Sequence, residues 1–254
     1  MLRRQFLNRL GFSFGASLLA PKTLLAASSS LESSNQIQPA DWVALRNLFP
    51  LTRDYIQLST FLLASHPKPV SLAIEKHRKG LDENPSDYWH DRFLTIEGDI
   101  AKETANYMGG KGENIALTDS TTMGLGLVYS GLKLAPDDEI LQTFHDHYST
   151  DMSLAHRANR TGAVVRRIAL YDNPAKTSVD DVLKRLTAGI TNNTKVVAVT
   201  WVHSSTGVKL PIRAMADKIA SINKSRKAVK QILFCVDGVH GFGIENENIS
   251  ELGC

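Results

Sequence analysis

The sequence is poor in cysteine, which excludes one common way of stabilising a small exported domain. It contains two cysteines in 254 residues, Cys235 inside an apolar run and Cys254 at the last position. Two such positions do not form the even, regularly spaced framework of disulfide-rich secreted domains. Stability must therefore come from a hydrophobic core, for which a chain of this length is sufficient.

The apolar stretch near the N-terminus, residues 10–20, is too short to span a bilayer as a mature helix. It follows a basic segment, in which Arg3 and Arg4 precede Phe6-Leu7 in a pattern that resembles a twin-arginine export signal. We therefore expect residues 1–27 to be a signal peptide and the protein to be periplasmic, without a stable membrane anchor. An amphipathic first helix of a cytosolic protein is the alternative.

The sequence also lacks a marked excess of one charge sign. Lysine and arginine total 29 and aspartate and glutamate 26; residues 1–27 hold four of the basic residues and none of the acidic ones, which leaves 25 against 26. A nearly neutral chain without a clustered basic face gives no support for nucleic-acid binding. The serine-rich residues 28–40 are expected to be a linker, and residues 41–254 to form the folded part.

Fingerprints of two large enzyme classes are missing as well. Gly124 and Gly126 lie within an expected helix rather than at a strand-to-helix turn, which disfavours a nucleotide-binding oxidoreductase. No Gly-x-Ser-x-Gly elbow follows an expected strand; the one such pattern, at residues 11–15, lies in the expected signal peptide. His203 and Ser204 are neighbours, and adjacent strand residues point to opposite faces, so nucleophilic hydrolysis is also disfavoured.

Alternating strand and helix patterns fill the sequence from residue 114 onward. Apolar runs rich in β-branched residues predict strands at 114–117, 139–144, 163–170, 195–202 and 231–236. Helical periodicity predicts helices at 121–132, 151–160, 179–190 and 212–223, and a longer helix upstream at 88–108. Repeated strand–helix–strand units indicate an α/β fold with three αβα layers around a mainly parallel sheet.

Polar clusters follow four of these five expected strands. They occupy residues 119–122, 145–149, 203–207 and 237–240. Turns favour such residues for local reasons, so one cluster alone would indicate little. Ligands of open parallel sheets bind beyond the carboxyl ends of the strands, however, and the convergence of four clusters predicts a ligand site there.

Two clusters suggest contacts with a charged ligand. Ser120, Thr121 and Thr122 open a helix, where free N–H groups attract phosphate, although a simple helix cap explains them equally well. Asp237 emerges from an apolar strand and needs a cation, such as a pyridinium nitrogen, to stay ionised. An Asp-Gly turn open to water is the alternative.

The histidine-rich cluster has two possible uses. His145 and His147 flank an aspartate, a combination that suits transition metals, but further ligands at regular spacing are lacking. We therefore expect no metal site and favour a flat ring that stacks on a flat cofactor.

Three motifs resemble those of class V aminotransferases, which include cysteine desulfurases, selenocysteine lyases and isopenicillin N epimerase-like enzymes. The resemblance runs from about residue 50 onward and is strongest at residues 118–122, 202–207 with Pro211, and 236–241. It implies the large domain of a fold type I enzyme that uses pyridoxal 5'-phosphate (PLP). An amino-acid substrate would react through an external aldimine, in epimerase-like, desulfurase or lyase, or aminotransferase chemistry.

The resemblance also implies roles for individual residues. The cofactor phosphate would bind Ser120, Thr121 and Thr122, and the pyridine nitrogen would face Asp237. His240 and Ser204 would lie near the phenolic oxygen. His147, or Tyr148 if the turn is offset by one residue, would stack on the ring.

The Schiff-base lysine of the family is expected beyond Cys254, so the resemblance assigns no catalytic residue to this sequence. The large domain would be incomplete and the C-terminal small domain absent, and we expect cofactor binding with little or no turnover. The complete enzyme would be a homodimer. A noncatalytic binding domain that keeps the cofactor fold without the lysine is the alternative.

Overall fold

The computed structural model describes residues 41–58 and 63–254, and the chain divides into two units, residues 1–76 and 77–254. In the first unit, α2 (Trp42–Asn47) begins after Asp41, whose carboxylate accepts a hydrogen bond from the Ala44 N–H at 2.8 Å. Helix α3 (Lys68–Glu83) crosses the boundary between the units. The expected signal peptide and linker, residues 1–40, lie outside the described residues.

The second unit contains a parallel sheet of four strands, which confirms the expected α/β fold class. They are β1 (Glu139–Thr143), β2 (Val164–Ile168), β3 (Thr194–Thr200) and β4 (Leu233–Asp237). Their order across the sheet is β2-β1-β3-β4, and each neighbouring pair is parallel. The order of connection reverses between β1 and β3, and such a point is where open α/β sheets bind ligands.

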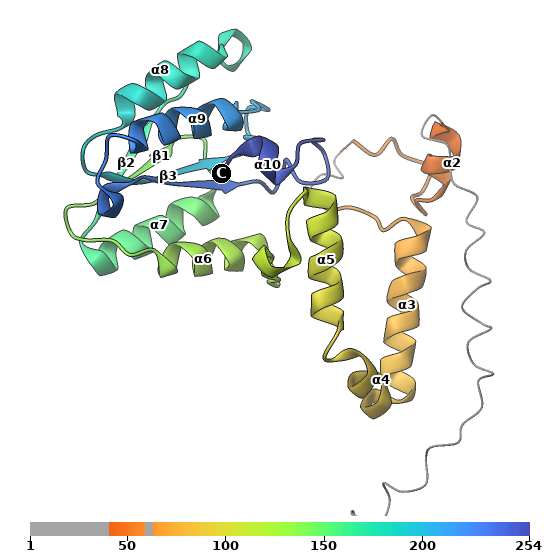
Figure 1. The fold of residues 1–254 in the computed structure, drawn as a ribbon. Coiled ribbons are helices and arrows are strands. Elements are labelled where there is room, and N and C mark those ends of the chain that lie inside the picture. Colours follow the sequence, from red (N-terminus) through yellow and green to blue (C-terminus); the bar gives the residue numbers. More distant parts are fainter. Residues whose placement is uncertain (1–40, 59–62) are drawn as a thin grey trace, which may run out of the picture. The chain divides into compact units, whose positions relative to one another are not determined.

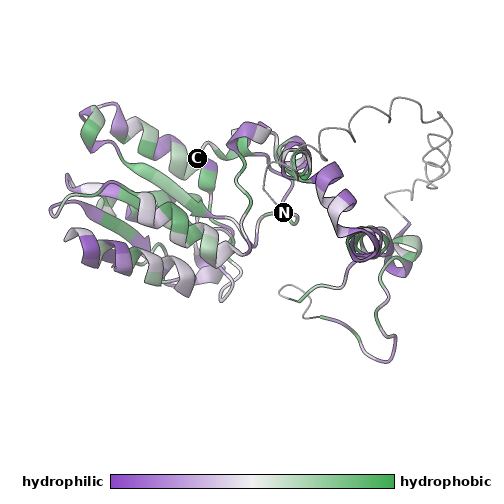
Figure 2. Ribbon diagram, turned by 90° about the horizontal axis from the view of Figure 1, so that it is seen from below, coloured by the Kyte–Doolittle hydropathy of each residue, from purple (hydrophilic) through white to green (hydrophobic). Residues whose placement is uncertain are grey.

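Helices cover both faces of this sheet (Figure 1), with α6 (Thr121–Gly131) and α7 (Tyr148–Thr161) on one face and α8 (Val179–Gly189) and α9 (Ile212–Asn223) on the other. Strand β3 supplies both cores by alternation: Val196 and Ala198 belong to one buried cluster, Val197 and Val199 to the other. Figure 2 shows both hydrophobic and hydrophilic residues along the helices that flank the sheet, as expected for helices with one buried side. No described helix is long and apolar enough to cross a bilayer.

The prediction of one long helix at residues 88–108 is wrong, because this segment forms two helices. Helix α4 (Pro85–Arg92) begins after Asn84, and α5 (Ile96–Met108) begins after Thr95. The Thr95 hydroxyl donates back to the Arg92 carbonyl at 3.4 Å, the kind of local bond that competes with helix continuation. Helix α5 ends as expected at Gly109, in the left-handed conformation with φ of 71°.

The expected strand at residues 114–117 is also wrong. Gly112–Asn114 form a 3₁₀ turn, and the Ile115 N–H donates to the Gly112 carbonyl at 3.0 Å, so that this donor serves a local turn and not a ladder. Further short elements are the 3₁₀ turns Pro174–Lys176 and Ala228–Lys230 and helix α10 (Ile249–Leu252).

Candidate functional site

A cavity of about 560 Å³ lies beyond the carboxyl end of β4, next to the start of α6. Thr121, at the start of α6, and Asp237, at the end of β4, both line it. Its other lining residues are mostly apolar or glycine, among them Tyr107, Leu125, Trp201, Gly241 and Phe242. A mainly apolar hollow with a few converging polar groups is typical of a small-molecule site.

Asp237 is the polar group that is buried most deeply on this wall. Its side chain is 2% exposed, and one carboxylate oxygen accepts a hydrogen bond from the Val239 N–H at 3.3 Å. The other oxygen, Oδ2, is buried without a hydrogen-bond partner among the described residues. Burying such an oxygen without a donor is costly. A protonated ring nitrogen would supply the missing donor, so the residue fits the group that the sequence predicts.

The three hydroxyl residues at the start of α6 differ in their use. Ser120 is the helix cap, since its Oγ accepts from the Met123 N–H at 3.2 Å. Thr121 lines the cavity, and the Thr122 hydroxyl lies 2.9 Å from the Ser149 hydroxyl at the start of α7. Two helix N-termini thus meet beside the cavity wall, an arrangement that suits an anion.

His147 is held against the strand ends by its backbone. Its N–H donates to the Thr200 hydroxyl at 3.2 Å, and its ring Nδ1 accepts from the Ser149 N–H at 3.4 Å. Tyr148 is 63% exposed at the first position of α7, with its ring centroid 4.3 Å from that of His147. His147 therefore has the more defined position of the two candidates for the stacking ring.

Of the predicted site residues, only Thr121 and Asp237 line the cavity; the others, Ser120, Thr122, His147, Ser204 and His240, do not. Ser204 is exposed in the turn that follows His203, and His240 is half-buried in the turn after β4. Their assignment to the phenolic oxygen stays a prediction.

Asp146 is a site residue that the sequence analysis treated only as the neighbour of two histidines. Its carboxylate accepts from the Thr143 N–H at 2.6 Å and from the Thr200 N–H at 2.7 Å, which joins the ends of β1 and β3. Burial raises the pKa of Asp146 to about 6, against the opposing effect of these hydrogen bonds. The same pattern that identified Asp237, an aspartate after an apolar strand, could have identified it.

His203 is fully buried, and a second missed residue, Tyr171, is its partner. The Tyr171 hydroxyl lies 2.7 Å from His203 Nδ1 and 2.7 Å from the Thr206 hydroxyl. Burial lowers the pKa of His203 to about 4, with the nearby His145 adding to the effect. Since His203 faces Tyr171 and Ser204 is exposed, the two residues do not form a nucleophile and base pair.

The Lys209 amino group is engaged in two ion pairs. Its amino group pairs with Glu245 at 2.6 Å and Glu247 at 2.8 Å, and it lies 5.9 Å from the centre of the Trp201 ring. Hydrogen bonds from the two glutamates raise the pKa of Lys209. A lysine held protonated in this way is a poor nucleophile for a carbonyl carbon. Within the part of the chain that the structure describes, no group of three or more His, Cys, Asp or Glu could hold a metal ion.

Curated relatives match most of this chain. An isopenicillin N epimerase of Amycolatopsis lactamdurans is 24% identical over 215 residues, which cover 84% of this chain and 52% of the epimerase. A cysteine desulfurase of Haloferax volcanii is 28% identical over 182 residues, covering 65% of this chain and 40% of the relative. The chain therefore spans about half the length of the relatives that it matches, or less.

Solved structures show the same fold. A mutant of C-DES with glycine covalently linked to its PLP cofactor matches with a TM-score of 0.68 and 21% identity, over 82% of this chain and 52% of C-DES. The apo cysteine desulfurase of Thermococcus onnurineus NA1 matches with a TM-score of 0.66 and 21% identity, over 84% and 51%. Together with the family model, these neighbours indicate PLP as the cofactor to test against the site. Because residues 64–254 match the family described as aminotransferase class-V, the chain belongs to the class V aminotransferase family.

Proposed function

We propose that this chain is the PLP-binding part of an exported enzyme that acts on an amino acid. The observation that carries the proposal is the buried Oδ2 of Asp237, which has no hydrogen-bond partner among the described residues and belongs to a cavity shared with Thr121. One carboxylate oxygen in need of a donor and one helix start suited to an anion match the two charged ends of PLP.

Asp237 would hold the proton on the pyridine nitrogen. When bound, PLP accepts the electron pair released at the substrate's α-carbon, and a protonated ring nitrogen strengthens this acceptance. The carboxylate is fixed for the task, because its backbone lies in the ladder between β3 and β4, where Asp237 is paired with Thr200. The mainly apolar wall around it limits access of water, which strengthens the charge interaction.

The starts of α6 and α7 would hold the phosphate, with Thr121 at the cavity and Thr122 braced by Ser149. The backbone N–H groups of a helix start supply donors that no other part of the helix has. His147 would stack on the ring from the end of β1, and Ser204 and His240 would serve the phenolic oxygen. These assignments rest on the motifs of the sequence and on the position of each turn.

The reaction would be epimerase-like, desulfurase or lyase, or aminotransferase chemistry. Relatives named as isopenicillin N epimerase and as cysteine desulfurase support an amino-acid type of substrate. No lysine is found among the residues that line the cavity. We therefore expect these 254 residues to bind PLP noncovalently and to show little or no turnover. From the family resemblance, we expect the complete enzyme to be a homodimer.

Export is supported by the twin-arginine pattern in residues 1–27. Twin-arginine transport carries folded proteins, so the cofactor could be loaded before export. Replacing Arg3 and Arg4 by lysine should keep the precursor in the cytoplasm, as seen by cell fractionation. Unchanged export of the doubly substituted precursor would contradict this part of the proposal.

A titration of the chain with PLP tests cofactor binding. The unaltered chain should bind PLP saturably, and Asp237→Asn should weaken binding at least about tenfold, since it replaces a charge-assisted contact by a neutral one. Asp217→Asn is the matched control, because Asp217 pairs only with the exposed Arg213 on α9 and should leave affinity unchanged. Equal affinity of the unaltered chain and both variants would contradict the proposal.

A further inference from the structure

A chain of buried polar side chains joins the carboxyl ends of three neighbouring strands. Tyr171 follows β2, Asp146 follows β1, and His203 follows β3. The Tyr171 hydroxyl is hydrogen-bonded to His203 Nδ1 at 2.7 Å. His203 Nε2 lies 4.0 Å from Asp146 Oδ1, which is near but beyond hydrogen-bond distance, so Nε2 has no hydrogen-bond partner among the described residues. The side chains of His203 and Asp146 are 0% and 1% exposed, so water does not compete for these contacts.

One arrangement of the protons satisfies both contacts of the Tyr171 hydroxyl. The Thr206 hydroxyl lies 2.7 Å from the Tyr171 oxygen, so that Thr206 can donate to Tyr171 while Tyr171 donates to His203 Nδ1. A neutral imidazole that accepts at Nδ1 carries its proton on Nε2. That proton faces the side of the ring where Asp146 lies, and the carboxylate's other contacts are backbone N–H groups of Thr143 and Thr200.

Two members of this chain of groups, Asp146 and His203, are each next in sequence to an expected cofactor contact. Asp146 precedes His147, and both bind Thr200: Asp146 through the Thr200 N–H at 2.7 Å, His147 through the Thr200 hydroxyl at 3.2 Å. His203 precedes Ser204, and its backbone N–H donates to the Val208 carbonyl at 3.1 Å, which closes the turn that presents Ser204. Moving Asp146 or His203 must therefore move one of these two neighbours.

His145 closes the chain of groups on its outer side. Its ring stacks on Tyr171, with centroids 4.6 Å apart and an angle of 3° between the planes. The ring of Tyr171 is thus fixed by stacking while its hydroxyl is fixed by two hydrogen bonds. Replacement of Tyr171 by phenylalanine keeps the stack and removes only the hydroxyl contacts.

We propose that Tyr171, His203 and Asp146 are positioning residues that set the orientation of the bound cofactor ring through His147 and Ser204. The inference rests on the proposed function. It differs from a purely structural role, because loss of the chain of groups should change how the ring is oriented as well as how stable the protein is.

Circular dichroism of bound PLP measures this orientation. Free PLP is achiral and has no ellipticity in its absorption band, whereas PLP held in one orientation by the protein acquires it. For Tyr171→Phe and for His203→Gln, we expect PLP affinity to fall about threefold to tenfold, the effect of losing one or two buried hydrogen bonds. The ellipticity per bound PLP should fall by about half or more, because the ring samples several orientations.

Tyr129→Phe is the matched control, since it also removes one buried hydroxyl but from the core cluster on the α6 and α7 face. It should leave the ellipticity per bound PLP unchanged. Inorganic phosphate, which by the proposed function would contact only the helix starts, should compete equally well in the unaltered chain and in all three variants. Thermal melting identifies any variant that fails to fold, and the two independent substitutions keep the inference open to refutation.

The outcomes separate the two proposals. Saturable PLP binding by the unaltered chain, with equal ellipticity per bound PLP in Tyr171→Phe, His203→Gln and Tyr129→Phe, would overturn the positioning role alone. A failure of the unaltered chain to bind PLP at all would overturn the proposed function and this inference with it. Loss of ellipticity in the first two variants only is the result that supports it.

Discussion

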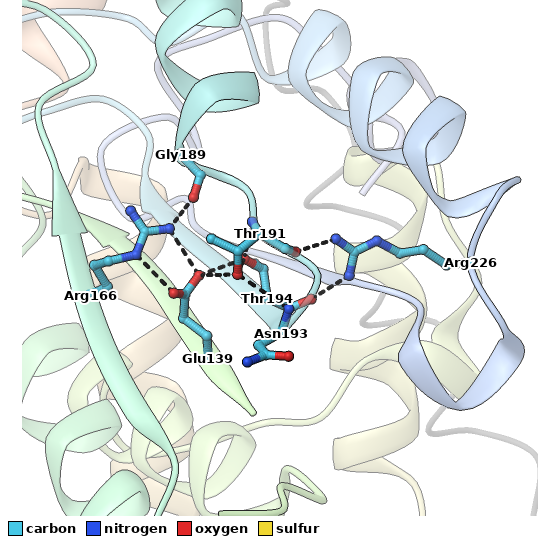
Figure 3. Close-up of polar contacts among 7 residues, drawn as sticks. All are labelled: Glu139, Arg166, Gly189, Thr191, Asn193, Thr194 and Arg226. Atoms are coloured by element: carbon cyan, nitrogen blue, oxygen red, sulfur yellow. Dashed lines mark hydrogen bonds and ion pairs between the residues drawn. The ribbon is translucent and has the colours of Figure 1, made fainter. Parts of the chain in front are cut away.

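The two ends of the sheet differ in whether their polar groups have hydrogen-bond partners. At the amino ends of the strands, the Glu139 carboxylate accepts two hydrogen bonds from the Arg166 guanidinium, at 2.8 and 2.9 Å (Figure 3). It accepts a third from the Thr194 hydroxyl at 2.6 Å. Arg226 binds the carbonyls of Thr191 and Thr194, so the turn between α8 and β3 is held from both sides. All the charges in this network have partners.

At the carboxyl ends, several buried polar atoms have no hydrogen-bond partner among the described residues. They include Asp237 Oδ2, Trp201 Nε1 and His203 Nε2. A stable domain gains nothing from such atoms, since each keeps an unrecovered desolvation cost. The difference teaches that the amino end of the sheet serves folding, whereas the unpaired atoms at the carboxyl end cost stability and fit the ligand site that we propose there.

Glu139→Gln should disrupt the network at the amino end of the sheet and cause the largest loss of stability. The substitution leaves the Arg166 guanidinium without its carboxylate in a half-buried network, so we expect the free energy of unfolding to fall by about 2–4 kcal/mol. Urea denaturation measures this loss, and PLP affinity of the folded variant should be unchanged. Asp172→Asn, which breaks an exposed pair with Arg185, is the control; an equal loss in both variants would contradict the comparison.

Gly241→Ala should destabilise the carboxyl end of the sheet through a steric clash with Trp201. A Cβ atom at this position would overlap two carbon atoms of the Trp201 ring, so the loop or the ring must move. We expect a loss of about 1–3 kcal/mol and weaker PLP binding, because both residues line the cavity. In Gly243→Ala nothing lies within 4 Å of the new atom, and only the φ of 77° opposes it, at about 1 kcal/mol. A larger loss in Gly243→Ala would refute this account of the loop.

Asp237→Asn should stabilise the chain without PLP, the opposite sign from Glu139→Gln. The variant removes a buried carboxylate whose Oδ2 has no donor, while an amide oxygen can still accept from the Val239 N–H. We expect the free energy of unfolding to rise by about 1 kcal/mol in the absence of PLP. Urea denaturation of the two proteins side by side measures the sign, and a loss of stability would mean that Asp237 has a structural role.

Asp146→Asn and His203→Gln should have opposite dependence of stability on pH. The raised pKa of Asp146, about 6, contributes stability that is present below its usual value of 3.8 and is lost as pH rises through 6. The lowered pKa of His203, about 4, contributes stability that is present above its usual 6.5 and is lost as pH falls through 4. In the unaltered chain the two slopes oppose each other between these values.

Relative to the unaltered chain, His203→Gln should therefore lose stability as pH rises from about 4 to 6. Asp146→Asn should lose stability as pH falls from about 6.5 to 4. Urea denaturation at several pH values in this range gives both slopes. Parallel slopes in the two variants would show that the groups do not titrate as burial requires.

The fold could be predicted from the sequence where one rule decides the structure. Apolar runs such as that of β3 are buried on both faces, as predicted for a parallel sheet, and Ser120 caps α6, which was one of the two readings left open for it. The short apolar segment at 114–117 carries no such information, because a run of four residues does not specify whether a ladder partner exists. The break at Thr95 depends on a side-chain bond that periodicity cannot show.

The candidate site was predictable in part for the same reason. Asp237 follows from a general rule about strand ends and Thr121 from the preference of helix starts for anions, and the structure brings them to one cavity. The contacts of Asp146, His203 and Tyr171 depend on how three turns pack in space, over separations of 25 to 57 residues along the chain. A sequence without coordinates gives no direct sign of contacts between such distant turns.

The protonation of the ring nitrogen tests the central claim most directly. Nuclear magnetic resonance of PLP labelled at the pyridine nitrogen, bound to the unaltered chain and to Asp237→Asn, reports whether this atom carries a proton. We expect a protonated nitrogen at neutral pH in the unaltered chain and a neutral nitrogen in the variant. The same nitrogen signal in both proteins would contradict the account, because Asp237 would then not face the ring.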